Sequence, residues 1–143
     1  ALVMMRRSSA EQRGLAPLAT LIGHATHAQA PGWFTTAPVG AIEKLFARTG
    51  WSSREVDLYE INEAFAVVTM AAMKEHGLPH DKVNVHGGAC ALGHPIGATG
   101  SILIGTIIDE LERCGGRYGL VTMCAAGGMA PAIIVERVDD FVD

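Results

Sequence analysis

Positive charge is scarce in this sequence. Its 143 residues include 11 lysines and arginines against 15 aspartates and glutamates, which gives a formal net charge of -4. Surfaces that attract nucleic acid or anionic lipids are basic, so we expect no nucleic-acid partner and no membrane partner. Long apolar runs are lacking too, because no stretch reaches the roughly 18 consecutive apolar residues of a membrane-spanning helix.

Cysteine is also rare. Cys90, Cys114 and Cys124 are an odd set without a C-x-x-C pair, so neither a disulfide framework nor a zinc site is predicted. The four histidines outside residues 83–100 share no ligand spacing with carboxylates or cysteines, and no metal site is assigned to them. Unpaired cysteines favour a reducing compartment, and we expect a cytoplasmic protein.

Hydrophobic residues and glycines, by contrast, are plentiful. Hydrophobic side chains make up 49% of the chain, which is enough to bury a core, so one compact unit is expected. The 17 glycines gather after residue 86, and the stretch "VNVHGGACALGHPIGATG" at residues 83–100 contains five of them. Glycines at this density indicate loops built for close approach of the backbone to another group.

The order of apolar and turn-rich segments predicts an α/β fold. Helices are expected from Pro38 to Gly50, from Asn62 as N-cap to Gly77, and over residues 98–113, where apolar residues recur at helical spacing. Strands are expected at residues 18–28, 56–61, 83–85, 118–124 and 131–138. This alternation predicts a mixed five-stranded sheet with helices on both faces, in which the last strand is antiparallel.

His94 and Cys124 are the first candidates for chemistry. His94 lies in "GHPIG", where Pro95 stiffens the backbone and the next helix exposes free amides at its N-terminus. An imidazole held there can act as a base or stabilise an oxyanion, whereas a histidine that only bonds a turn would not need the flanking glycines. Cys124 ends an apolar strand before "AAGG", and it is either a nucleophile or proton carrier or an inert buried side chain.

Asn62 and Glu63 directly follow a predicted strand, and strand ends commonly present side chains to a site. An asparagine cap, followed by a glutamate that matches the helix dipole, explains the same pair without a function. The stretch "GHPIGATG" lacks both the G-x-G-x-x-G spacing and a Gly-Lys-Ser/Thr ending, so we reject a nucleotide-binding loop.

Three separated motifs together resemble the C-terminal motifs of thiolases. They are "NEAFA" at residues 62–66, "GGACALGHPIGATG" at residues 87–100 and "CAAGG" at residues 124–128. The family contains acetyl-CoA acetyltransferases and 3-ketoacyl-CoA thiolases, whose chains consist of two similar halves. The resemblance implies that residues 1–14 are the end of the N-terminal half, a strand and a short helix, and that residues 15–143 are the C-terminal domain.

The resemblance also implies roles for single residues. His94 would activate the nucleophile and help to bind the thioester oxygen, Cys124 would carry protons as acid and base, and Asn62 would hold a water in the same oxyanion hole. Ala64 and Phe65 would line the channel for the pantetheine arm of coenzyme A. Coenzyme A is a substrate in this family, and neither a metal nor a redox cofactor is implied.

The function implied is acyl transfer, as thiolytic cleavage of 3-ketoacyl-CoA or Claisen condensation of acyl-CoA units. The family's nucleophilic cysteine belongs to the N-terminal half, so this chain would need that half as a partner and would be inactive alone. The complete enzyme would be a homodimer or homotetramer. The alternative from another class is a non-catalytic acyl-CoA-binding module or a split-subunit assembly module.

Two positions depart from the family pattern. Ala126 stands where a glycine is common, at the amide that would complete a second oxyanion hole, and alanine disfavours a positive φ. Residues 129–131 replace a more usual run that contains glycine. Ketoacyl synthases and lipid-carrier-type thiolases share the fold, but they typically carry a histidine or other motifs where Asn62 stands, so an ordinary thiolase is favoured.

Overall fold

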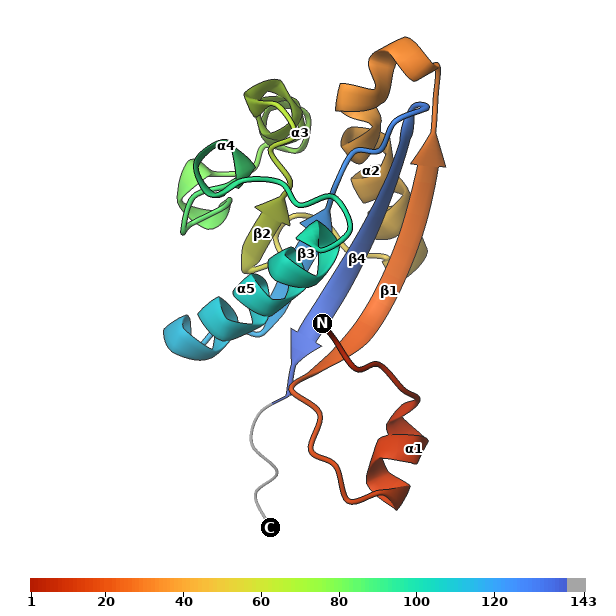
Figure 1. The fold of residues 1–143 in the computed structure, drawn as a ribbon, viewed down its shortest axis with the longest axis vertical. Helices are drawn as coiled ribbons and strands as arrows, with labels where there is room; N and C mark the ends of the chain where they lie inside the picture. Colours follow the sequence, from red (N-terminus) through yellow and green to blue (C-terminus); the bar gives the residue numbers. More distant parts are fainter. Residues whose placement is uncertain (139–143) are drawn as a thin grey trace.

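Four strands form one mixed sheet in the computed structural model, which describes residues 1–138 (Figure 1). The sheet has the order β1-β4-β3-β2. β2 and β3 pair in parallel, whereas β4 is antiparallel to both of its neighbours, so the predicted mixed sheet with an antiparallel last strand is confirmed. The strands are β1 (Ala19–Ala28), β2 (Leu58–Ile61), β3 (Tyr118–Thr122) and β4 (Met129–Arg137).

The fifth strand, predicted at residues 83–85, is not formed. Val83 makes a single bridge to Tyr59, and Asn84 has a φ of 48°, a left-handed conformation that ends an extended segment. The Asn84 side chain takes over the pairing, because its Oδ1 accepts the Ile61 amide at 2.8 Å and its Nδ2 donates to the Ile61 carbonyl at 2.9 Å. One side chain therefore satisfies this part of the β2 edge in place of a strand.

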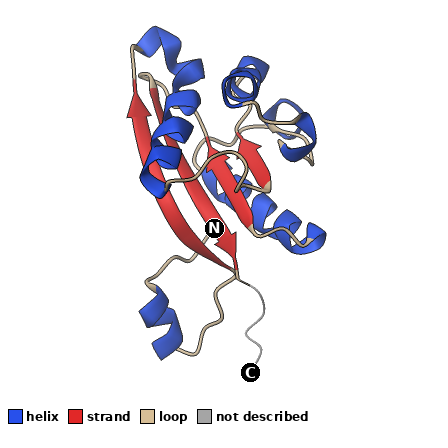
Figure 2. Cartoon of the chain, turned by 180° about the vertical axis from the view of Figure 1, so that it is seen from behind, coloured by secondary structure: helices blue, strands red, loops and turns tan. Residues whose placement is uncertain are grey.

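Helices cover both faces of the sheet, as predicted. α2 (Ala37–Thr49) and α3 (Ala66–His76) pack on one face, and α5 (Thr99–Cys114) packs on the other. Figure 1 is seen from the α5 side and Figure 2 from the α2 side. Strand residues alternate between the two cores, so Leu120 packs with α2 and α3, while Val121 packs with α5.

The predicted ends of two helices are confirmed. Gly50 and Gly77 follow α2 and α3 in the left-handed conformation, with φ of 71° and 62°. Glycine adopts this conformation at little cost, and its amide then bonds a carbonyl of the last helical turn. None of the described helices is both long and apolar enough to cross a membrane.

Short helical segments complete the described chain. They are α1 (Arg7–Gln12), η1 (Pro31–Thr36), η2 (His80–Lys82) and α4 (Ala89–Leu92). The strand predicted before α1 is wrong, because residues 1–6 have no regular structure and pair with no described strand. Without a neighbouring strand the backbone groups of this segment have no ladder to join, and Val3 is 89% exposed.

Gly128 fixes the turn before β4 against the end of β1. Its φ is 85°, its carbonyl accepts the Gln29 amide at 2.9 Å, and a Cβ at this position would overlap the Gln29 carbonyl oxygen. Gly127 provides a matched comparison. Its φ is 86°, but a Cβ there would lie 3.7 Å from its nearest neighbour, Cε of Met129.

We expect Gly127→Ala to lower the free energy of unfolding by about 1–3 kcal/mol through backbone strain alone. Gly128→Ala should lower it further, because the strain is then combined with a clash against backbone that cannot rotate away. Urea unfolding of the two variants measures the difference. Equal losses would contradict the tight contact between Gly128 and Gln29.

Candidate active site

The carboxyl ends of two parallel strands bring Asn62 and Cys124 to one edge of the sheet. Ile61 of β2 pairs with Thr122 of β3, so Asn62 lies one residue beyond the paired position and Cys124 two residues beyond it. The Asn62 amide donates to the Thr122 carbonyl at 3.0 Å, which extends the pairing past β2. Because β2 and β3 are neighbours, the two candidate residues emerge from adjacent positions.

Asn62 does not cap α3, so that prediction is wrong. The helix begins at Ala66, and its N-cap is Phe65 in an extended conformation. The Asn62 side chain turns instead to the loop within the glycine-rich stretch at residues 83–100, the glycine-rich loop, where its Nδ2 lies 3.4 Å from Nε2 of His94. Asn62 is 1% exposed, and its Oδ1 has no hydrogen-bond partner within residues 1–138.

Thr99 holds the His94 ring from the opposite side. Nδ1 of His94 lies 2.7 Å from Oγ1 of Thr99, and the Thr99 hydroxyl donates its single proton to the Pro95 carbonyl at 3.0 Å. The Thr99 oxygen therefore accepts from His94, which places the ring proton on Nδ1. Nε2 keeps its lone pair and faces the Asn62 amide group. His94 thus presents a basic nitrogen at the edge of the sheet.

Glu63 braces the loop that carries His94. Its carboxylate accepts the Cys90 amide at 3.2 Å and Nδ2 of Asn84 at 3.3 Å. Gly88 lies so close to this carboxylate that a Cβ would overlap it, so the glycine is required by the brace itself. The sequence presented Glu63 only as a residue after a strand and did not reveal these contacts, because its partners lie more than twenty positions away.

His86 attaches the beginning of the same loop to α5. Its Nε2 lies 2.7 Å from Oε2 of Glu110, and Arg113 donates to both oxygens of that carboxylate at 2.6 Å. The hydrogen bonds from Arg113 and then from His86 lower the pKa of Glu110 to about 2. The loop is therefore tied to α5 at both ends, through Glu110 at His86 and through Thr99 at His94.

Cys124 is a buried thiol at the edge of the sheet. It is 6% exposed, and burial raises its pKa, so the thiol keeps its proton at neutral pH. Cys90 and Cys114, by contrast, are exposed. The structure shows no hydrogen bond between Cys124 and either Asn62 or His94 in the part of the chain that it describes.

Ala126 has a conformation that alanine tolerates. The positive φ values in its turn belong to Gly127 and Gly128, and among residues 1–138 only Asn84 has a positive φ without being a glycine. No described residue accepts a hydrogen bond from the Ala126 amide. That N-H is consequently free to bind a ligand oxygen.

Ala64 and Phe65 lie between Asn62 and α3. Ala64 is partly buried against the core beneath α2 and α3, whereas Phe65 is 56% exposed. The Phe65 ring packs edge-on against Phe34, with 6.2 Å between the ring centroids. Phe65 therefore offers an apolar surface next to the candidate site.

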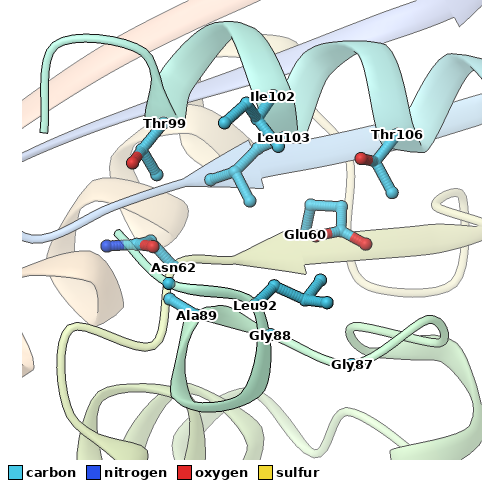
Figure 3. Close-up of a pocket in the computed structure, with 11 residues that line it drawn as sticks. Glu60, Asn62, Gly87, Gly88, Ala89, Leu92, Thr99, Ile102, Leu103 and Thr106 are labelled. Atoms are coloured by element: carbon cyan, nitrogen blue, oxygen red, sulfur yellow. The ribbon is translucent and has the colours of Figure 1, made fainter. Parts of the chain in front are cut away.

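A cavity of about 40 Å³ lies between the glycine-rich loop, β2 and α5 (Figure 3). Glu60 lines it from β2 and Asn62 from just beyond the end of that strand, and Thr99, Leu103 and Thr106 face it from α5. Within the described residues, no group of three or more histidine, cysteine, aspartate or glutamate side chains is placed to hold a metal ion.

The hydrogen bond from His94 to Thr99 can be tested directly. We expect the Nδ1-H tautomer of His94 to predominate, and Thr99→Val to reduce its excess over the other tautomer by roughly two- to tenfold, the scale of one net hydrogen bond. Long-range proton–nitrogen NMR of the imidazole measures the two forms. Thr99→Ser keeps the hydroxyl and should leave the ratio unchanged; a loss as large as in Thr99→Val would contradict the assignment.

Comparison with known proteins places this arrangement in a family. Residues 15–137 match the family model described as thiolase, C-terminal domain. The cytosolic acetyl-CoA acetyltransferase of Mus musculus is 45% identical over 137 residues, which cover 96% of this chain and 34% of that protein. The acetyl-CoA acetyltransferase of Chromobacterium violaceum is 44% identical over 137 residues, with coverages of 96% and 35%.

A solved structure agrees with the sequence matches. The crystal structure of the Bacillus anthracis acetyl-CoA acetyltransferase superposes with a TM-score of 0.89 at 39% sequence identity, and the match covers 94% of this chain and 34% of that one. The chain thus spans about one third of the length of the relatives it matches. The family model, the curated relatives and the shared fold together show that this chain belongs to the thiolase family and contains its C-terminal domain.

Proposed function

We propose that this chain supplies the acid–base half of an acyltransferase, which cleaves 3-ketoacyl-CoA with coenzyme A or condenses acyl-CoA units in the reverse direction. The observation that carries the proposal is the fixed His94 ring, held between Thr99 and Asn62 at the edge of the sheet where Cys124 also emerges. Membership of the thiolase family supports the same reaction.

The nucleophile comes from outside this chain in our proposal. Cys90 is exposed, and its pKa is raised by desolvation and by the negative charge of Glu63. A raised pKa disfavours the thiolate form that a nucleophilic cysteine needs. Cys114 lies at the C-terminal end of α5, where the helix dipole disfavours an anion. The cysteine that accepts the acyl group would belong to the N-terminal thiolase half, which is therefore the proposed partner.

In the cleavage direction, Nε2 of His94 takes the proton of the nucleophilic thiol as its sulfur attacks the 3-keto carbon. His94 and a water held by Asn62 then stabilise the oxyanion. When the bond between C2 and C3 breaks, Cys124 gives its proton to C2, and acetyl-CoA leaves. The Cys124 thiolate then takes the thiol proton of coenzyme A, whose sulfur attacks the acyl cysteine, and the departing nucleophile regains its proton from His94. The raised pKa of the Cys124 thiol suits the protonation of C2, because the resting group is protonated.

In the condensation direction the same groups work in reverse. When the acyl cysteine forms, the Cys124 thiol gives its proton to the departing sulfur of coenzyme A. The resulting Cys124 thiolate then removes the α-proton of a second acyl-CoA, and the Ala126 amide binds the oxygen of the enolate in the second oxyanion hole. Ala64 and Phe65 line the path of the pantetheine arm. Both directions move protons and an acyl group without transferring electrons, so the proposed reaction requires coenzyme A as substrate and no redox cofactor.

The proposed setting of the enzyme is the cytosol, because free cysteines persist in reducing compartments. The complete enzyme would act as a homodimer or homotetramer. The competing function, a non-catalytic acyl-CoA-binding or split-subunit assembly module, predicts binding of coenzyme A without turnover after the two halves are combined.

We expect His94→Ala and Cys124→Ser each to lower kcat for acetoacetyl-CoA thiolysis by about 10²–10⁴-fold in the enzyme assembled with the N-terminal half, because each removes one acid–base group. Cys90→Ser is the control: it changes a thiol in the loop that carries His94, but this thiol has no role in the steps above. The variant should retain kcat.

The kinetics are followed by loss of acetoacetyl-CoA. An assembled enzyme that binds coenzyme A but shows no turnover would favour the binding module. Activity that survives His94→Ala would contradict the acid–base assignment.

A further inference from the structure

Glu60 is a buried carboxyl group that has no role in the catalytic steps proposed above. It lies at the centre of β2 and is 4% exposed, although a strand covered on both faces normally carries apolar residues. Tyr59 and Ile61 pack into the core beneath α2 and α3, so Glu60 and Asn62 point to the opposite face, toward α5. No described residue forms a hydrogen bond with the Glu60 carboxyl group.

The cavity beneath the loop joins Glu60 to Asn62. Both residues line it, and their side chains face it in Figure 3. Residues two apart on a strand are separated by about 6.6 Å, a spacing that one water molecule between their side chains can bridge. A cavity of about 40 Å³ exceeds the roughly 10–15 Å³ that one water needs.

The polar groups around the cavity suit a water. Oδ1 of Asn62 is a buried acceptor without a partner within residues 1–138, and a buried acceptor of this kind is normally hydrogen-bonded to protein or to ordered water. The Glu60 carboxyl can donate to a water when protonated and accept from it when ionised. A single water can therefore donate to Asn62 and bond Glu60 in either state.

We propose that a water molecule bound in this cavity bridges Glu60 and Oδ1 of Asn62, and that Glu60 is thereby a positioning residue for Asn62 and, through it, for His94. The carbonyl end of the Asn62 amide is then held toward Glu60, which directs Nδ2 toward Nε2 of His94. Without the hydrogen bond from this water, the Asn62 side-chain amide could rotate by half a turn. Its Oδ1 would then face the lone pair of Nε2 of His94. The effect on catalysis rests on the proposed function.

The described charged groups near Glu60 form no hydrogen bond with its carboxyl group, so they do not take the place of the bridging water. His86 approaches from the loop and Glu63 from the end of β2, and His86 is itself bound to Glu110 of α5, which Arg113 also contacts. Burial raises the pKa of Glu60 to about 7, an effect that His86 opposes and Glu63 reinforces. Near neutral pH the bridge therefore operates with both protonation states of Glu60 present.

Two substitutions of similar size separate positioning from packing. In the assembled enzyme, Glu60→Leu fills the space without a polar atom, and we expect kcat for thiolysis to fall roughly tenfold, the scale of one lost buried hydrogen bond, with KM nearly unchanged. Glu60→Gln keeps a partner for the water and should restore most of kcat. Circular dichroism and thermal unfolding establish that both variants fold.

Two outcomes would overturn the inference: equal losses in Glu60→Leu and Glu60→Gln, or full kcat in Glu60→Leu. A high-resolution crystal structure of the assembled enzyme provides a readout that does not depend on activity. We expect it to show a water within hydrogen-bond distance of both Glu60 and Oδ1 of Asn62, and a cavity without such a water would refute the bridge. If the proposed function itself were wrong, His94→Ala would instead leave turnover unaffected.

Discussion

The attachment of the glycine-rich loop to α5 is the constraint on which the site depends. A segment with this much glycine has little intrinsic preference for one conformation, so its position must come from contacts with rigid neighbours. The contacts of His86 with Glu110 and of His94 with Thr99 tie its two ends to one helix, and Glu63, just beyond β2, braces the middle. The His94 ring is consequently held by α5 and by the residues that follow β2 rather than by the loop itself.

The parallel pairing of β2 with β3 makes this placement useful. Parallel neighbours end at the same edge of a sheet, so Asn62 and Cys124 emerge beside each other although they are far apart in sequence. A turn leads into the antiparallel β4, and its positive-φ positions are glycines. The Ala126 amide in this turn forms no hydrogen bond with a described residue. The edge therefore brings together the buried Cys124 thiol and the Asn62 side chain, with the His94 imidazole beside Asn62.

Local patterns in the sequence were sufficient for most of the fold. Apolar periodicity and terminal glycines predicted α2 and α3, and alternation of helices and strands predicted the mixed sheet. The expected strand at residues 83–85 failed because the Asn84 side chain pairs with Ile61, which no local pattern reveals. The expected strand within residues 1–6 failed because extended backbone needs a neighbouring strand, and propensity alone does not provide one.

The candidate site was predictable only in part, for the same reason. His94, Cys124 and Asn62 stand in motifs that can be recognised in the sequence, and the structure brings Asn62 and His94 together. The contacts that hold these residues could not be foreseen. Glu110 acts from α5, outside the three motifs, and Asn62 resembled a helix cap rather than a partner of His94. Glu60 looked like part of an ordinary strand until its burial and the cavity beside it were visible.

In the function proposed here, this chain provides the acid–base groups, and a cysteine elsewhere in the enzyme carries the acyl group. Peptide mass mapping after incubation of the assembled enzyme with acetyl-CoA and rapid acid quenching tests it most directly. We expect a thioester-linked acetyl group on a cysteine outside the 143 residues of this chain. Stoichiometric acetylation of Cys90, Cys114 or Cys124 would contradict it.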